Sequence, residues 1–149
     1  MISKKILIIS SAAICSAVSC GAMATNGSLK LSSTGEPSSI TQIAVECGQS
    51  RSNEAPAIPI PADSSVAVPY FAVKLYGDPT YCDFYRSTSQ GRHIGWAEFY
   101  VGTNSAHATI VSYQNLDPIH YNLTMVTDSG TPIVVGTPYT SMDITIARQ

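Results

Sequence analysis

Residues 81–102 read YCDFYRSTSQGRHIGWAEFYVG, and this stretch decides the fold class. Apolar side chains alternate with polar ones in residues 81–86 and again in residues 93–101. Alternation of this kind places successive side chains on opposite faces of a strand. The polar, glycine-containing residues 87–91 separate the two runs and have the composition of a turn. The stretch therefore predicts a β-hairpin.

Short runs of the same kind continue on both sides of this hairpin, with no long helical period between them. Turn-forming residues fill the gaps, as at residues 102–105 and 128–132. We therefore expect one all-β domain, an antiparallel β-sandwich of immunoglobulin-like or jelly-roll type. The nine expected strands are SLKLSS (28–33), TQIAVEC (41–47), YFAVKLYG (70–77), YCDFYR (81–86), HIGWAEFYVG (93–102), HATIVSYQ (107–114), HYNLTMVT (120–127), PIVVG (132–136) and MDITIAR (142–148).

The first 24 residues have the order of a secretory signal. Lys4 and Lys5 precede the apolar run ILIISSAAICSAV (6–18), and AMA (22–24) has the small-x-small pattern of a cleavage site. The apolar run is too short to span a bilayer. We expect residues 1–24 to be a cleaved signal peptide and residues 25–149 to be the mature domain, which is secreted, periplasmic or on the cell surface.

A second interpretation of this region concerns Cys20. The sequence AVSCG (17–21) resembles a bacterial lipobox, although that motif usually has Leu where this chain has Ala17. Lipidation of Cys20 is a minor alternative that would anchor the protein to a membrane.

The charge of the mature chain excludes some classes of partner. Without Lys4 and Lys5 it has six basic and ten acidic side chains, a net charge of −4, and its Lys and Arg residues are scattered. Nucleic acids and anionic membrane surfaces are bound through clustered positive charge. We expect neither partner, and no later segment is long and apolar enough for an integral membrane span.

Two cysteines follow the expected cleavage site, Cys47 and Cys82. An even number in an exported chain indicates a structural disulfide. Closing this loop would stabilise the fold by roughly 3.8 kcal/mol in the chain-entropy model. We expect the bridge to tie the two sheets of the sandwich together. The alternative is a redox or nucleophilic thiol, but such pairs usually have Cys-x-x-Cys spacing or an activating His.

Aromatic residues form the strongest cluster, with nine of the twelve between residues 70 and 100. Alternation assigns Phe71, Phe84 and Phe99 to the apolar faces. Pointing the other way are Tyr81, Tyr85, Trp96 and Tyr100, which we take as candidate ligand-binding residues. Tyr85 and Trp96 flank the same turn and are expected to be cross-strand neighbours. Such a cluster could stack on a sugar ring or anchor a protein. The alternative is that a loop or the second sheet covers this face.

Two further segments bear on binding. Pro69 interrupts the run from Val66 to Tyr76 and predicts an edge strand or a bulge there, and an edge can accept a partner's strand. Residues 48–63 (GQSRSNEAPAIPIPAD) form the one long connection. This connection is expected to be a tethered, partly polyproline loop, with IPIP (58–61) able to pack along a sheet edge. The alternative is a PxxP-type or flexible binding loop.

Signatures of catalysis and metal binding are absent, so we expect a protein that is not an enzyme and has no cofactor or metal. No hydrolase motif or phosphate-binding loop occurs. The expected strands place His93 and His107 at opposite ends. His93 and His120 could share an end, with Asp117 as an added carboxylate ligand, but two His without a nearby Cys make a poor zinc site. Asp83 and Glu98 could form a glycosidase carboxylate pair, but they are expected to be solvated, outward-facing charges.

One limited resemblance concerns residues 26–82. The order NGSLKLSSTG (26–35), IAVEC (43–47), YFAVKL (70–75) and Cys82 is similar to the opening of chaperone–usher pilins. This resemblance implies an N-terminal segment that donates a strand and a protein that polymerises. The C-terminus, IARQ (146–149), departs from the penultimate aromatic residue usual in pilins.

From these features we expect an exported, non-enzymatic binding or adhesion module that contacts an extracellular or envelope protein, or a glycan, through its aromatic face or an edge strand. One alternative is a pilin-like structural subunit of a surface fibre. Less favoured is a small secreted hydrolase or a hydrolase inhibitor, for which residues 48–63 are the only candidate loop.

Overall fold

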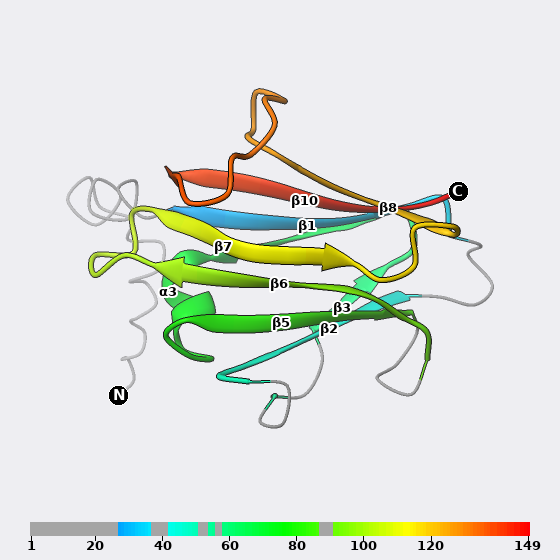
Figure 1. The fold of residues 1–149 in the computed structure, drawn as a ribbon, viewed down its shortest axis with the longest axis horizontal. Helices are drawn as coiled ribbons and strands as arrows, with labels where there is room; N and C mark the ends of the chain where they lie inside the picture. Colours follow the sequence, from blue (N-terminus) through cyan, green and yellow to red (C-terminus); the bar gives the residue numbers. More distant parts are fainter. Residues whose placement is uncertain (1–26, 37–41, 51–53, 56–57, 87–90) are drawn as a thin grey trace, which may run out of the picture.

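A computed structural model describes residues 27–36, 42–50, 54–55, 58–86 and 91–149. The expected signal peptide and Cys20 lie outside these residues. Two sheets pack face to face around a hydrophobic core (Figure 1), and in this part of the chain one disulfide joins Cys47 and Cys82. The prediction of an all-β sandwich with one disulfide is confirmed.

The first sheet contains the two ends of the described chain. Its strand order is β4-β1-β10-β8, and β1 runs parallel to β10 while the other pairs are antiparallel. Its bounds are β1 (Ser28–Thr34), β4 (Ser65–Pro69), β8 (Tyr121–Val126) and β10 (Ser141–Arg148). We call it the four-stranded sheet. As Pro69 predicts, β4 is an edge strand.

The second sheet contains the stretch with which the sequence analysis began. Its strand order is β3-β2-β5-β6-β7-β9, and all of its pairs are antiparallel. Its bounds are β2 (Gln42–Gly48), β3 (Ile58–Pro61), β5 (Thr80–Arg86), β6 (His93–Val101), β7 (Ala108–Asn115) and β9 (Pro138–Tyr139). We call it the six-stranded sheet. The predicted β5–β6 pairing is present, and IPIP (58–61) forms the edge strand β3.

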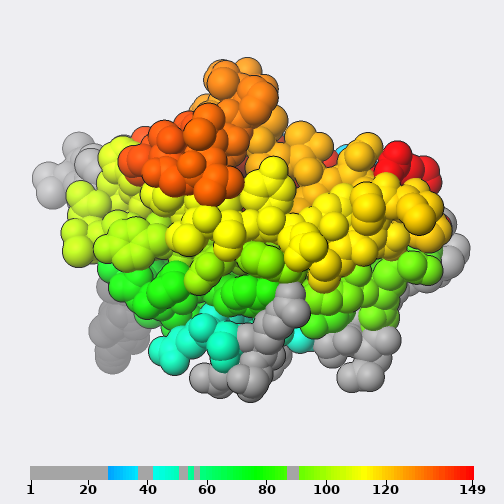
Figure 2. Space-filling model, viewed as in Figure 1, coloured from blue at the N-terminus to red at the C-terminus, as the bar shows by residue number. Residues whose placement is uncertain are grey.

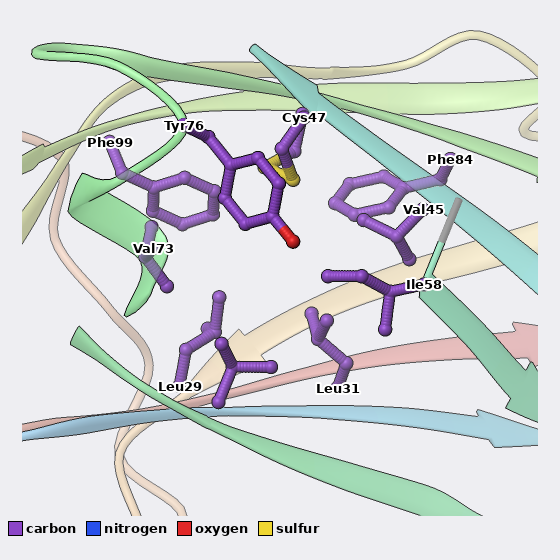
Figure 3. A pocket seen from close by; sticks show the side chains of 11 residues that line it. Leu29, Leu31, Val45, Cys47, Ile58, Val73, Tyr76, Phe84 and Phe99 are labelled. Atoms are coloured by element: carbon purple, nitrogen blue, oxygen red, sulfur yellow. A yellow bond between two sulfur atoms is a disulfide. The ribbon is translucent and has the colours of Figure 1, made fainter. Parts of the chain in front are cut away.

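Alternating side chains of both sheets fill the core. Leu31 and Ile144 from the four-stranded sheet, and Phe84 and Phe99 from the six-stranded sheet, are each at most 2% exposed. One cavity of about 10 Å³ remains among apolar side chains, and Figure 3 shows the Tyr76 hydroxyl pointing into it. That volume has room for about one water molecule. This cavity is therefore too small to hold a ligand larger than water.

The expected strand YFAVKLYG (70–77) is wrong, because these residues form the short helix α3 (Tyr70–Lys74). Pro69 ends β4 in an extended conformation and serves as the helix N-cap. Tyr70 and Val73, three positions apart, face the core, whereas Phe71 is 52% exposed. The placement of Phe71 with the apolar faces is corrected accordingly.

The disulfide also differs from the expectation, since it lies within one sheet. Cys47 of β2 and Cys82 of β5 are directly opposite in the ladder, with Cα atoms 4.1 Å apart. The enclosed residues contain β3, β4 and α3, and so supply an edge strand to each sheet. The bridge itself therefore lies within the six-stranded sheet, although the loop that it closes contributes strands to both sheets.

The end of the chain holds another departure. The expected strand PIVVG (132–136) is only a bridge between Pro132 and Val126, after which the chain crosses toward β7. There the Gly136 N–H donates to the Ile110 carbonyl at 2.9 Å. This connection spans the open side of the sandwich between β8 and β7.

Candidate functional site

The outer face of the six-stranded sheet brings together the four predicted ligand-binding residues. Tyr81 and Tyr85 of β5 lie on this face, and so do Trp96 and Tyr100 of β6. The core-facing residues between them are Cys82, Phe84, Ala97 and Phe99. The side chains of Glu46, Asp83 and Glu98 share this outer face by the same alternation, and His93 joins them because the β5–β6 register shifts after Phe84. We call these eight residues the aromatic–acid face.

Two ring stacks organise the aromatic–acid face. The Tyr81 and Trp96 ring centroids are 5.2 Å apart, and those of Tyr85 and His93 are 4.6 Å apart. The predicted Tyr85–Trp96 neighbours are not register partners: a bulge after Phe84 places Tyr85 opposite His93 instead. The rings therefore stand in two pairs along the hairpin.

The carboxylates of this face are held by hydrogen bonds. Asp83 is 1% exposed, and its Oδ1 lies 2.6 Å from His93 Nε2. The Ser112 hydroxyl donates to Glu98 Oε1 at 3.2 Å. The expectation that Asp83 is solvated is wrong, because its imidazole partner and the neighbouring rings enclose it. Glu46 lies opposite Asp83 in the β2–β5 ladder, so two acidic residues are adjacent there.

Exposure differs among the rings. Tyr100 is 48% exposed, whereas Tyr81, Tyr85 and Trp96 are half-buried and make contacts within the protein. A face of this kind offers ring surfaces for stacking and carboxylate oxygens that accept hydrogen bonds. Glu46 and His93 were missed as members of the face. Alternation from Cys47 would have placed Glu46 there, whereas the place of His93 depends on the register shift after Phe84, for which the sequence gives no signal.

A second polar cluster lies at one end of the sandwich, where β1, β5, β8 and β10 begin or end. The Tyr121 hydroxyl donates to Glu36 Oε2, and Arg86 Nε lies 3.5 Å from Glu36 Oε1. Arg148 Nη1 donates to the Tyr121 oxygen at 3.3 Å, and its guanidinium lies over the Tyr121 ring. Burial, then the bond to Glu36, raises the pKa of Tyr121. Because the Glu36 carboxylate is fully buried, this cluster is structural.

The β7–β8 connection continues this cluster toward the surface. Asp117 Oδ1 lies 2.8 Å from His120 Nδ1, and Asp117 Oδ2 lies 3.2 Å from Arg92 Nη1. Burial alone would raise the pKa of Asp117, but His120 and Arg92 together outweigh it and lower the pKa below its ordinary value of 3.8. Asp117 and His120 therefore do meet through a hydrogen bond, and Arg92 forms an ion pair with the same carboxylate.

This ion pair makes acid stability measurable. A carboxylate with a lowered folded-state pKa adds stability above its unfolded pKa, and this is lost as the pH falls through the folded value. We expect Asp117→Asn to flatten the decline of unfolding free energy below about pH 4, measured by urea unfolding at several pH values. The exposed Asp128→Asn should keep the wild-type slope. Equal slopes in all three proteins would contradict the assignment.

Metal and membrane features complete the description. Among the described residues, no group of three His, Cys, Asp or Glu side chains is placed to hold a metal ion. No helix in the same part of the chain is long and apolar enough to cross a membrane.

The site is thus defined by its own geometry, an aromatic–acid face on a rigid six-stranded sheet. No protein-family model matches this chain, and neither a curated protein nor a solved structure matches it.

Proposed function

We propose that this protein is an exported, non-enzymatic binding module that holds a glycan on the aromatic–acid face. The disulfide supports export, because such bonds persist in oxidising compartments. The small size of the core cavity supports a surface site, because this cavity has room for about one water molecule.

One observation carries this proposal: rings and carboxylates alternate on one flat face. Tyr81, Asp83 and Tyr85 follow one another outward along β5, and Trp96, Glu98 and Tyr100 do so along β6. The C–H edges of a sugar ring carry weak positive charge and pack on the negative face of an aromatic ring. The sugar hydroxyls donate to carboxylates. Tyr100, which is 48% exposed, and Glu98, two positions before it on β6, offer one contact of each kind.

The test uses the most exposed ring and the carboxylate beside it. Tyr100→Ala and Glu98→Gln should each weaken glycan binding at least tenfold, as measured by calorimetry with the best ligand from a glycan array. Thr124→Ala, an exposed change on β8 of the four-stranded sheet, should leave binding unchanged. Circular dichroism would check that each variant is folded.

Two results would overturn the proposal. One is an array with no glycan bound by the folded wild-type protein; the other is binding that survives Tyr100→Ala combined with Glu98→Gln. A purified envelope protein that binds wild type but not this double variant would reassign the face to a protein partner.

The alternative of a pilin-like fibre subunit receives no specific support from the geometry. A subunit completed by a donated strand has a vacant strand position in its sheet. In the described residues, β1 is flanked on one side by β4 and on the other by β10, both from the same chain. Any donated strand would therefore have to use another edge.

A further inference from the structure

The edges of the two sheets are not equally protected. β3 carries Pro59 and Pro61, and β4 ends at Pro69, so both lack some backbone donors. The chain itself covers the edge of β8 at two points. The Ile133 N–H donates to the Met125 carbonyl at 3.0 Å, and Asn115 Nδ2 donates to the Tyr121 carbonyl at 2.9 Å.

The remaining edge belongs to β7, and it is covered only at its start. β9 pairs with Ala108 and Thr109, and Gly136 bonds to Ile110. Beyond Ile110, no strand of the described chain pairs with this side of β7. The Leu116 N–H donates to the Ile94 carbonyl of β6 at 2.8 Å. Because bonding direction alternates along a strand, the N–H and C=O of Tyr113 point away from β6.

The open part of β7 has none of the side chains that usually guard an edge. Residues 108–116 (ATIVSYQNL) contain no charged residue and no proline. A bulge opposite Phe99 interrupts the ladder near Val111, so the regular open stretch is centred on Tyr113. Val111 and Tyr113 are 45% and 46% exposed. An uncharged, apolar edge of this kind invites pairing with another strand.

Exposed apolar side chains gather on the same side of the sandwich. Of the nine large hydrophobic residues that are exposed in the described chain, six follow β7 and its neighbouring connections: Val111, Tyr113, Leu116, Ile119, Val134 and Val135. Figure 2 shows the yellow surface of this region with the orange segment 127–137 above it. A concentration of this kind marks a contact surface more than scattered single residues do.

We propose that β7 pairs antiparallel with β7 of a second copy of this chain, with Tyr113 opposite Tyr113 across a two-fold axis. This register brings Val111 opposite Asn115 and Ser112 opposite Gln114, so no like charges meet. An uncharged edge makes no favourable electrostatic contact with a charged partner strand. The β7 strand of a second copy is uncharged along its whole length and offers the same apolar side chains.

Pairing about this axis joins the two six-stranded sheets and keeps their outer faces on one side. If the proposed function holds, the dimer presents two aromatic–acid faces side by side and binds repeated glycans with added avidity. The dimer itself does not depend on that function. The contact is smaller than a standard interface of roughly 800 Å² per partner, so we expect a Kd of roughly 10–100 μM.

Sedimentation equilibrium of the purified exported protein tests the association. Tyr113→Lys places a charge at the centre of the edge and should raise the dimer Kd at least tenfold. Leu75→Lys is the matched control, since Leu75 is 83% exposed at the C-cap of α3 and is not part of β7. Glycan binding per protomer should be unchanged in both. A wild-type protein that is monomeric at about 1 mM would overturn the proposal, and so would equal effects of the two lysines.

A cysteine substitution tests the register. Cα atoms of a hydrogen-bonded antiparallel pair lie about 5.5 Å apart, which a disulfide can span. Tyr113→Cys should form a covalent dimer under mild oxidation, whereas Leu75→Cys should not; Cys47 and Cys82 are already bonded to each other. Equal crosslinking of both variants would mean random collision and would overturn the register.

Discussion

Replacing Cys47 and Cys82 together with alanine should lower the free energy of unfolding by about 4 kcal/mol. The two residues are 35 positions apart, and a loop of this length corresponds to roughly 3.8 kcal/mol of chain entropy in the unfolded state. Both side chains are buried in the core, so their loss adds a small packing cost. Urea unfolding of the wild type and the double variant measures the difference.

The position of the bridge predicts which part of the fold weakens first. The closed loop holds β3, β4 and α3, so their amide protons should lose more exchange protection than those of β6 and β7. Reduced wild-type protein serves as the control, because it loses the bond without losing the sulfur atoms. A decrease below about 1 kcal/mol in both proteins would show that the loop is already ordered in the unfolded ensemble.

Arg86→Met should destabilise the protein by about 3 kcal/mol through the carboxylate that it leaves behind. The Glu36 side chain is fully buried, and Arg86 and the Tyr121 hydroxyl are its neighbours. Removing one partner of a buried ion pair leaves a charge without compensation, which costs roughly 3–5 kcal/mol. Because Arg86 keeps some exposure, we expect the lower end of that range.

A second substitution separates charge from packing. Adding Glu36→Gln to Arg86→Met removes the unpaired buried carboxylate charge, and the amide oxygen of the new side chain can still accept the hydrogen bond from the Tyr121 hydroxyl. Most of the lost stability should therefore return. Arg92→Met is the matched control, since this arginine is half-exposed in its ion pair and should cost at most about 1 kcal/mol. A double variant no more stable than Arg86→Met alone would assign the loss to packing of the arginine stem instead.

The sequence predicted the six-stranded sheet better than it predicted the segment that connects the sheets. Alternation is clear in β5 and in residues 96–101 of β6, where aromatic and acidic residues separate the core-facing positions. The sequence of residues 70–75 fits both a strand and a helix. Apolar residues at positions 71, 73 and 75 have the two-residue period of a strand, while those at 70 and 73 have the spacing of a helix. Burial of Tyr70 decided between them, and Gly27 lies so close to the Tyr70 ring that a Cβ there would overlap it.

Other errors arose because sequence distance does not reveal sheet membership. Cys47 and Cys82 both face inward, as alternation predicts, but alternation does not say whether two inward residues share a sheet. The Glu36 cluster was missed for the same reason, since Glu36, Arg86 and Tyr121 come from three separate segments. Each looks like an ordinary strand-end residue until the topology brings them together.

The parallel pairing of β1 with β10 also has a consequence for the order of folding. β1 lies between β4 and β10, and its partner Ser141 is more than one hundred residues further along the chain. The β5–β6–β7 meander needs only contacts between consecutive strands, so it can form before the C-terminal strand β10 is available. The four-stranded sheet must wait for the last strand, and until then β1 exposes Leu29 and Leu31. A chain of this topology therefore needs protection of its first strand until the last strand is available, and its slowest folding step should be the docking of that last strand.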